Sequence, residues 1–337
     1  MSKIIQEDIE NIINSDLDWY KFKKSNILLT GATGLIGQYI LRVLIRVNEK
    51  FKLEMNICCF TRSTEKFKNI FNDIFNSSLY YSDIINENIH YDYIIHMASP
   101  ASSHNYLLEA LDVINLNVMF TNKLLSLSQD IKGLLYFSSG EVSGQTNKEI
   151  ITENDYGYLD PTDIRNCYGE SKRMAENLCQ SYYHKYSMPI FCVRPEHIYG
   201  PSIDLKNDKR VYSEFITNII NNENIIIKSD GLSSRNFCYI TDAMDGFFRV
   251  LLKGQPGQSY NVGNREGKIT IRDLANLLIS MYPEKKLSVS YKKQDNMYLE
   301  NRVKNAPILS TKKLDRLGYN CKVSLQDGFS RTIKNFI

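Results

Sequence analysis

Tyr168 and Lys172 lie four positions apart, in the segment Tyr-Gly-Glu-Ser-Lys. On a helix this spacing places a phenol and an ammonium group one turn apart on the same face. Because a nearby positive charge stabilises a phenolate, we expect the pKa of Tyr168 to fall. Such a phenol can take a proton from a hydroxyl group while a hydride leaves the same carbon. The chain has 22 tyrosines, so the spacing gains its weight only from the elements around it.

A glycine-rich turn near the N-terminus is the first of those elements. Residues 27–29 are apolar and predict a buried strand, glycines follow at 31, 34 and 37, and a helical apolar pattern then begins. A strand that turns through glycines into a helix is typical of a dinucleotide site, because the backbone and the helix N-terminus can both approach a pyrophosphate. The alternative is an ordinary strand–helix turn.

Further strands are predicted at 55–60, 93–96, 134–137 and 190–193. A short additional strand is predicted to end near Asp83. Helices are predicted at 4–14, 63–76, 110–128, 212–221, 241–253 and 271–281. This alternation predicts an α/β fold, a Rossmann-type doubly wound parallel sheet with a smaller C-terminal substrate lobe. We assign residues 1–199 to a dinucleotide-binding domain, with 237–262 returning to it, and residues 200–236 and 263–337 to the substrate lobe. Ligands should bind in the cleft between the lobes.

The residues that follow two of these strands bear on ligand binding. Ala98 and Ser99 are small and would allow a cofactor to approach closely. The second strand ends in Thr-Arg-Ser at 61–63, without the acid that selects NAD. Because an arginine suits a 2′-phosphate, Arg62 leaves NADP open beside NAD, and stacking of Arg62 on adenine is the alternative.

The composition excludes several classes of function. The net charge of +3 is too small and too dispersed to indicate nucleic-acid binding. No apolar run approaches the roughly 18 residues of a membrane span, and we expect no signal peptide. The seven cysteines are odd in number and lack CxxC spacing, which favours reduced thiols in a cytoplasmic protein without a metal site.

Together these residues resemble the extended short-chain dehydrogenase/reductase family, the NAD-dependent nucleotide-sugar epimerases and dehydratases. The resemblance covers roughly residues 25–330 and is greatest to UDP-glucuronate decarboxylases and related surface-polysaccharide enzymes. The segments that carry it are His-Met-Ala-Ser-Pro-Ala-Ser at 96–102, Arg-Asn-Cys-Tyr-Gly-Glu-Ser-Lys-Arg at 165–173, Asp-Lys-Arg-Val at 208–211, Ser-Arg-Asn-Phe at 234–237 and Tyr-Asn-Val-Gly at 260–263.

The resemblance implies roles for individual residues. Tyr168 would be the catalytic base, Lys172 would hold the nicotinamide ribose, Ser139 would bond the reacting oxygen, and Glu141 would act as an acid or base at C5 of the sugar. The implied cofactor-binding set is Gly31, Thr33, Gly34, Leu35, Ile36, Gly37, Arg62, Ala98, Ser99, Tyr168 and Lys172.

The implied substrate is a nucleoside-diphosphate sugar. Arg235 would grip its diphosphate with a guanidinium fork, and Arg210 is similarly placed. Arg302 is a further candidate, although its spacing to Pro307 departs from the family pattern. His197 stands where an asparagine is common, as either a ligand or a satisfied pocket residue. Ser139 completes the implied substrate-binding set.

Two departures from the family bear on the reaction. Gly140 stands where 4,6-dehydratases use an aspartate as an acid and where decarboxylases carry a hydroxyl residue, so it matches neither. Ser143 replaces a tyrosine. We therefore expect oxidation at C4 to a 4-keto sugar, followed by decarboxylation or epimerisation, for surface-polysaccharide precursors. The alternatives are a 4,6-dehydratase, a simple C4 dehydrogenase and a non-catalytic dinucleotide-binding regulator. The apolar helix at 110–128, with the Tyr168 helix, would form a homodimer interface.

Overall fold

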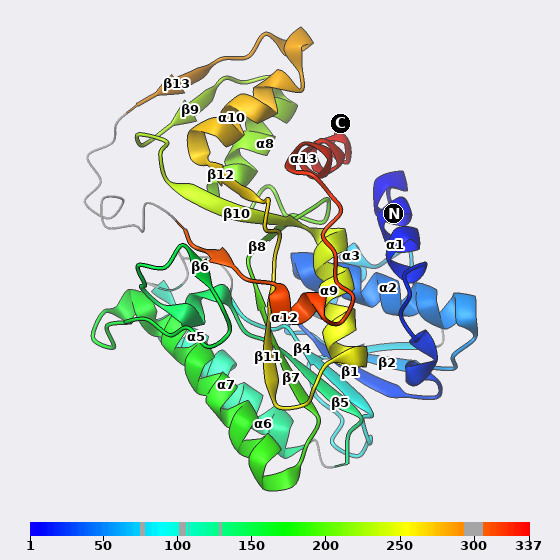
Figure 1. Cartoon of the computed structure of the whole chain (residues 1–337). Helices are drawn as coiled ribbons and strands as arrows, with labels where there is room; N and C mark the ends of the chain where they lie inside the picture. The colour runs from blue at the N-terminus through cyan, green and yellow to red at the C-terminus, as the bar shows by residue number, and fades with distance from the viewer. Residues whose placement is uncertain (75–77, 101–105, 107, 128–129, 293–305) are drawn as a thin grey trace.

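A parallel sheet of seven strands forms the larger lobe in the computed structural model, which describes residues 1–74, 78–100, 106, 108–127, 130–292 and 306–337 (Figure 1). The order across the sheet is β11-β7-β5-β4-β1-β2-β3, and every neighbouring pair is parallel. The strand order reverses between β1 and β4, which confirms a doubly wound sheet. The strands are β1 (Asn26–Thr30), β2 (Asn56–Phe60), β3 (Leu79–Ser82), β4 (Tyr93–His96), β5 (Gly133–Phe137), β7 (Ile190–Pro195) and β11 (Gln258–Val262).

Helices cover both faces of this sheet. On one face α1 (Lys3–Ile13), α2 (Leu35–Phe51) and α9 (Ile240–Lys253) pack together, and on the other α6 (Thr121–Ser126) packs against α7 (Cys167–Tyr186) (Figure 1). Successive residues of a strand point to opposite faces. Leu29 accordingly joins the core under the first layer, and Leu28 joins the core under the second. Burial on both faces explains why the strands are almost continuously apolar.

Two predicted helices differ from the observed ones. The helix expected at 110–128 consists of α5 (Ala110–Ile114), a π-helical turn η2 (Asn115–Phe120) and α6. The helix expected at 63–76 was predicted too long, because α3 (Thr64–Ile70) ends at Ile70. Asp73 lies beyond that end and pairs with Arg42 at 3.0 Å, and the Phe71 ring packs under the same guanidinium.

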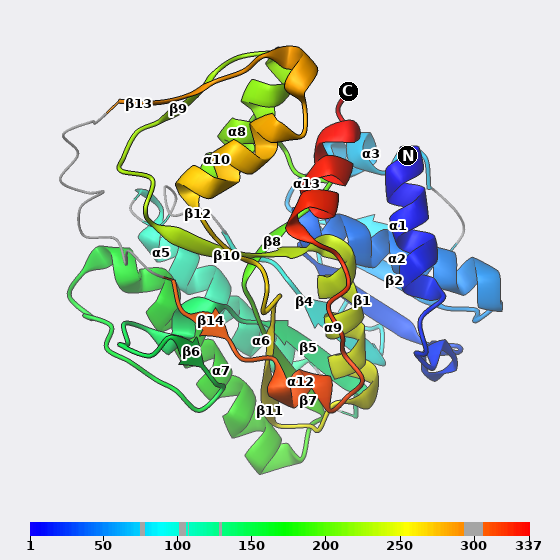
Figure 2. The ribbon, with the colours of Figure 1, turned by 45° about the horizontal axis from the view of Figure 1, so that its top comes forward.

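The smaller lobe carries its own strands and helices (Figure 2). A three-stranded sheet has the order β12-β10-β8, and two short parallel pairs, β13–β9 and β14–β6, flank it. The division of the chain into domains stays a prediction. The remaining elements are β6 (Ile150–Ile151), β8 (His197–Tyr199), α8 (Val211–Asn221), β9 (Ile225–Ile227), β10 (Ser234–Tyr239), β12 (Lys268–Thr270), α10 (Ile271–Ser280), β13 (Val289–Tyr291), β14 (Ile308–Leu309), α12 (Lys312–Asp315) and α13 (Leu325–Lys334), with short 3-10 turns η1 (Trp19–Phe22), η3 (Gly140–Ser143), η4 (Ile164–Asn166) and η5 (Pro283–Lys285).

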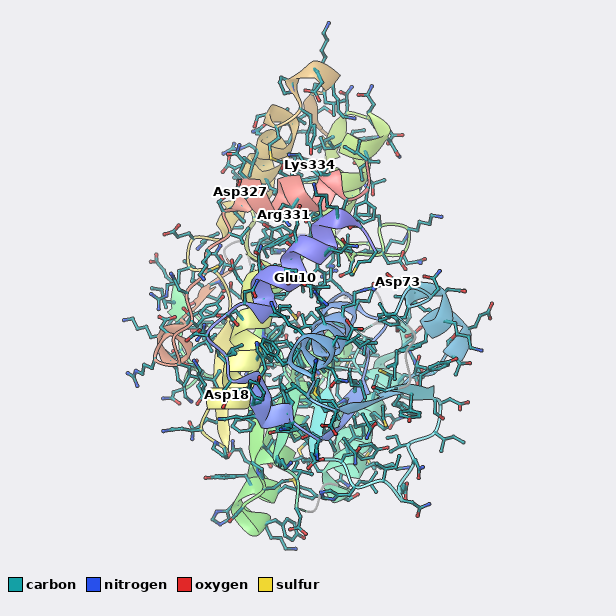
Figure 3. The ribbon with its side chains drawn as sticks, turned by 90° about the vertical axis from the view of Figure 1, so that its right-hand side faces the viewer. Glu10, Asp18, Asp73, Asp327, Arg331 and Lys334 are labelled. Atoms are coloured by element: carbon teal, nitrogen blue, oxygen red, sulfur yellow. The ribbon has the colours of Figure 1, made fainter. Side chains whose placement is uncertain are left out.

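The two terminal helices are joined through one buried carboxylate. Asp8 on α1 accepts hydrogen bonds from the hydroxyl groups of Tyr39 and Tyr239, at 2.8 and 2.7 Å, and pairs with Arg331 on α13 at 2.7 Å. Figure 3 shows Arg331 where α13 lies next to α1. Burial raises the pKa of Asp8, and these three partners offset part of that rise. The last helix is therefore fixed to the first. Among the described residues, no helix combines the length and apolarity needed to span a bilayer.

Candidate active site

The glycine turn after β1 packs directly against the end of β4. Gly31 has a φ of 78°, and a Cβ built on it would lie 2.7 Å from the backbone nitrogen of Ala98. A Cβ on Gly37 would lie 2.2 Å from the carbonyl oxygen of Gly31, so only glycine fits at either position. Helix α2 begins after Gly34 without a side-chain cap, which leaves its first N–H groups for an anion. The turn, with Thr33, Leu35 and Ile36 on it, fits the pyrophosphate of a dinucleotide.

A buried histidine, His96, holds the strands beneath this turn; it belongs to the segment at 96–102, but the sequence alone suggested no role for it. The Thr121 hydroxyl donates to the carbonyl oxygen of Asn117 at 2.6 Å, so Nε2–H of His96 must donate to Thr121 at 2.9 Å. The other ring nitrogen of His96 then accepts from the Thr30 hydroxyl at 2.7 Å. Burial lowers the pKa of His96 to about 3, which keeps it neutral and suits this tautomer. His96 thereby joins the ends of β1 and β4.

Tyr168 and Lys172 lie on one face of the first turns of α7, and both are buried. The Lys172 ammonium group donates to the carbonyl oxygen of Phe137, at the end of β5, at 2.6 Å. It lies 5.8 Å from the centre of the Tyr168 ring. The Tyr168 ring also stacks on that of Tyr106. The two rings are parallel within 7°, and their centroids are 4.5 Å apart. Tyr106 is a further residue for which the sequence alone suggested no role.

The expected lowering of the Tyr168 pKa is wrong for this structure. Burial raises the pKa of Tyr168, the negative charge of Glu141 raises it further, and hydrogen bonds with Ser139 and Ser99 only partly oppose this. Burial also lowers the pKa of Lys172 to about 7. The cost of burying either charge therefore outweighs the attraction between ammonium and phenolate that the sequence suggested.

The ends of β4 and β5 meet the Tyr168 helix at this point. Ser139 precedes η3 and accepts the N–H of Glu141 at 3.2 Å, and the Glu141 side chain is exposed. Ser99 donates to the side-chain oxygen of Asn117 at 2.8 Å, and the Asn117 amide donates to Ser171 on α7 at 2.9 Å. Since Asn117 lies in the π-helical turn, that turn serves to link the strand end to α7.

The structure also gathers three of the predicted substrate residues. In the parallel pairing of β8 with β10, His197 is opposite Phe237. Arg235 lies two residues before Phe237 on β10. His197 is exposed to solvent, although protein atoms surround its ring. This protein environment lowers the pKa of His197, and the charges of Arg235 and Arg210 act in the same direction. Arg210 also makes two Nε contacts of 2.9 Å with the carboxylate of Asp208. Arg210 and Arg235 thus lie near the neutral imidazole of His197, and we call these three residues the cationic wall.

The remaining predicted positions are placed as follows. A Cβ on Gly140 would lie 3.0 Å from the side chain of Leu309, so a larger residue would press on Leu309. Ser143 is buried, and its hydroxyl has no partner among the described residues. Arg62 is exposed just beyond β2. Arg302 lies outside the described residues.

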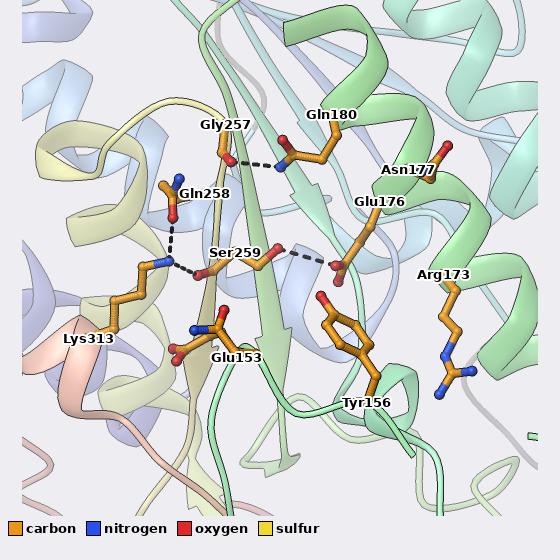
Figure 4. Close-up of a pocket in the computed structure, with 11 residues that line it drawn as sticks. Glu153, Tyr156, Arg173, Glu176, Asn177, Gln180, Gly257, Gln258, Ser259 and Lys313 are labelled. Carbon is orange, nitrogen blue, oxygen red and sulfur yellow. Dashed lines mark hydrogen bonds between the residues drawn. The ribbon is translucent and has the colours of Figure 1, made fainter. Parts of the chain in front are cut away.

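Two hollows adjoin these elements. One of about 500 Å³ is lined by Thr33 of the glycine turn and by Ser63 and Lys66 beyond β2, beside the expected adenosine position. The other, of about 360 Å³, lies between α7 and the start of β11 and does not reach Tyr168 (Figure 4). There Lys313 donates to Ser259 O at 2.9 Å, and Glu176 pairs with the buried Arg194 at 2.6 Å.

A doubly wound sheet, a glycine turn at its switch point and a Tyr–Lys helix beside that turn define a dinucleotide-dependent enzyme. Residues 27–263 match the model of the NAD dependent epimerase/dehydratase family, and the chain belongs to this family. It is therefore an NAD-dependent enzyme of nucleotide-sugar metabolism.

Individual relatives agree with this assignment. The chain is 30% identical to UDP-glucuronic acid decarboxylase 6 of Arabidopsis thaliana, over 94% of this chain and 90% of the relative. It is 26% identical to dTDP-D-glucose 4,6-dehydratase of Bos taurus, over 91% of this chain and 87% of the relative. Its fold matches the structure of a UDP-N-acetylglucosamine 4-epimerase from Methanobrevibacter ruminantium M1, with a TM-score of 0.80 and 22% identity, over 93% of this chain and 98% of the other.

Proposed function

We propose that the protein oxidises C4 of the hexose in a nucleoside-diphosphate sugar and then decarboxylates or epimerises the resulting 4-keto sugar. The proposal rests on one observation. The side chains of Tyr168, Ser139 and Ser99 lie within hydrogen-bonding reach of one another beside the glycine turn. Kinship with decarboxylases and dehydratases of nucleotide sugars supports the substrate class. We infer that the product is a precursor of a surface polysaccharide.

The chain supplies the groups that this oxidation needs. When bound, NAD supplies a hydride acceptor whose positive charge favours a nearby phenolate. Tyr168 takes the proton from the C4 hydroxyl group as the hydride leaves C4, and Ser139 holds the reacting oxygen. Lys172, which donates to the carbonyl oxygen of Phe137 at 2.6 Å, would hold the nicotinamide ribose. The glycines at 31, 34 and 37 would hold the pyrophosphate.

The second step depends on Glu141 and Gly140. A ketone at C4 makes C5 acidic, and it makes a carboxylate on C5 a β-keto acid that loses CO2. Tyr168 then returns its proton to the C4 oxygen as a hydride returns to C4, which restores the alcohol. Glu141 is an exposed carboxylate close enough to Tyr168 to raise its pKa, which suits an acid or base acting at C5. Gly140 offers no acid to protonate a leaving hydroxyl group. Decarboxylation and epimerisation, which need no such acid, are therefore favoured over dehydration.

The cationic wall would receive the diphosphate of the substrate. Arg235 and Arg210 supply guanidinium groups that match phosphate oxygens, and the neutral His197 ring between them can donate a hydrogen bond. Asp208 occupies one edge of the Arg210 guanidinium, and Arg235 donates to the carbonyl oxygen of Ser234 at 2.6 Å. Arg302 stays a sequence-based candidate for the same role.

We also propose a homodimer, formed by the layer of α5, η2 and α7. Four large apolar side chains on this layer are exposed: Leu108 by 71%, Leu111 by 76%, Met119 by 62% and Met174 by 47%. A run of exposed apolar residues on adjacent helices is typical of a protein–protein interface. The cytoplasmic location stays a prediction from cysteine usage.

A panel of UDP-, dTDP- and GDP-sugars, read by mass spectrometry, tests the reaction. Loss of CO2 would identify a decarboxylase, loss of water a dehydratase, and loss of two hydrogens a dehydrogenase. An isomeric product of unchanged mass would identify an epimerase. If the protein is saturated with NAD and no sugar is changed or gives reduced nicotinamide absorbance, the catalytic proposal is wrong and a non-catalytic regulator is the better description.

A further inference from the structure

One partly buried carboxylate ties four separate segments of the chain behind the cationic wall. Glu196 lies between β7 and β8, and its backbone N–H bonds Val262 O of β11 at 3.0 Å. Its Oε1 accepts the N–H of Leu309 in β14 at 2.8 Å and the side-chain amide of Asn236 in β10 at 3.3 Å. Its Oε2 accepts the N–H of Asn264, beyond β11, at 3.3 Å.

Gly263 and Asn236 pack closely against the Glu196 side chain. A Cβ built on Gly263 would lie 2.3 Å from Oε2, so the carboxylate packs directly on the Gly263 backbone. The Asn236 amide that reaches Glu196 also donates to the carbonyl oxygen of Pro307 at 2.7 Å. Glu196 and Asn236 thereby fix the chain from Pro307 to Leu309 against the ends of β7 and β10.

These contacts are one residue away from the substrate candidates. His197 follows Glu196 in the chain, and Arg235 precedes Asn236 in β10. Leu309, whose N–H the carboxylate accepts, places its side chain 3.0 Å from where a Cβ on Gly140 would lie. A shift of the Glu196 carboxylate would therefore also move the His197 imidazole, the Arg235 guanidinium group and the Leu309 side chain beside Gly140.

We propose that Glu196 is a positioning residue for substrate recognition, which sets the spacing between His197 and Arg235 and so the affinity for the diphosphate. The inference rests on the proposed function, since it requires a nucleoside diphosphate at the cationic wall. In its ionised form a carboxylate suits the task, because it accepts three N–H donors without presenting a hydrogen of its own. Burial raises the pKa of Glu196 to about 8, and the bonds from Leu309, Asn264 and Asn236 oppose that rise, so Glu196 is ionised chiefly above this pH.

Glu196→Gln is the sharpest test because it preserves the shape of the side chain. The amide can still accept from Leu309 and Asn236, but its NH2 group then faces the N–H of Asn264, so donor meets donor. Glu153→Gln is the matched control. Glu153 also accepts a backbone N–H of the same part of the sheet, that of Asn261 at 2.9 Å, but it lines the hollow of Figure 4 rather than the cationic wall.

The experiment measures the dissociation constants of UDP, dTDP, GDP and NAD by calorimetry at about pH 9, where Glu196 is ionised. It uses the full-length wild type and both variants, with thermal unfolding to confirm folding. We expect Glu196→Gln to weaken binding of the preferred nucleoside diphosphate about tenfold, while NAD affinity stays within about twofold and Glu153→Gln binds like the wild type. A Glu196→Gln protein that binds the nucleoside diphosphate normally, or loses both ligands equally, would overturn the inference. If the wild type binds none of the three nucleotides, the proposed function fails first, and the inference fails with it.

Discussion

The ammonium group of Lys172 lies 5.8 Å from the centre of the Tyr168 ring, and its short hydrogen bond, at 2.6 Å, goes to the carbonyl oxygen of Phe137 instead. Lys172 is thus fixed by the end of β5 rather than by the phenol. In this structure burial governs both side chains, raising the pKa of Tyr168 and lowering that of Lys172. The two residues share a face of α7 without forming the ion pair that their spacing suggested.

Replacing Tyr168 with phenylalanine removes only the hydroxyl group. We expect hydride transfer to fall by about 10²–10⁴-fold, the usual contribution of a positioned acid or base, while nucleotide binding persists. The measurement is the absorbance of reduced nicotinamide after a nucleotide sugar is added. Tyr186→Phe, an exposed tyrosine on the same helix, serves as the control and should react like the wild type. Wild-type rates in Tyr168→Phe would refute the assigned role.

Lys172 gives the protein a specific dependence of stability on pH. Its pKa is about 7 when folded, against an ordinary value of 10.5, so between these values the unfolded chain binds the extra proton. The contribution of Lys172 to stability should therefore rise as the pH increases from about 7 to about 10. In Lys172→Met this contribution disappears, so the melting temperature of the wild type relative to that of the variant should rise over that interval. Thermal unfolding at a series of pH values checks this, and parallel curves for the two proteins would contradict it.

The strands and the glycine turn could be predicted from the sequence because each is a local pattern. Apolar runs such as the one around Leu28 persist because helices cover both faces of the sheet, and the glycines at 31 and 37 are required by contacts within the turn itself and with Ala98. The grouping of His197, Arg210 and Arg235 was also foreseen, but from resemblance rather than from periodicity.

Other parts of the site depend on contacts that no local pattern records. His96 joins Thr30 to Thr121 across two strands and a helix, and the Tyr106 ring stacks on Tyr168 from 62 residues away. Glu196 draws its partners from three other segments. The direction of the Tyr168 pKa was missed for the same reason, because burial is a property of the folded chain and not of the Tyr–Lys spacing.

Two alanine substitutions in the glycine turn should have different effects on stability. Gly31→Ala places a Cβ 2.7 Å from Ala98 N at a φ of 78°, and strain of this kind costs about 1–3 kcal/mol. Gly34→Ala has its nearest contact at 3.5 Å and a φ of −79°, so its stability should match the wild type. Both should lose NAD affinity, because a methyl group would keep the backbone from the pyrophosphate. Equal stability of the two variants in denaturant titrations would argue against the packing at Gly31.

The proposed dimer can be tested at Leu111, whose side chain is 76% exposed on α5. If this helix layer is buried between two copies, Leu111→Glu places an unpaired charge inside the interface, which is strongly unfavourable. We expect the variant to be monomeric by light scattering at concentrations where the wild type is dimeric. Leu232→Glu, at a 49% exposed position in the smaller lobe, is the control and should leave the mass unchanged. A wild type that is monomeric at every concentration, or a Leu111→Glu protein that remains dimeric, would show that the exposed apolar layer is not the interface.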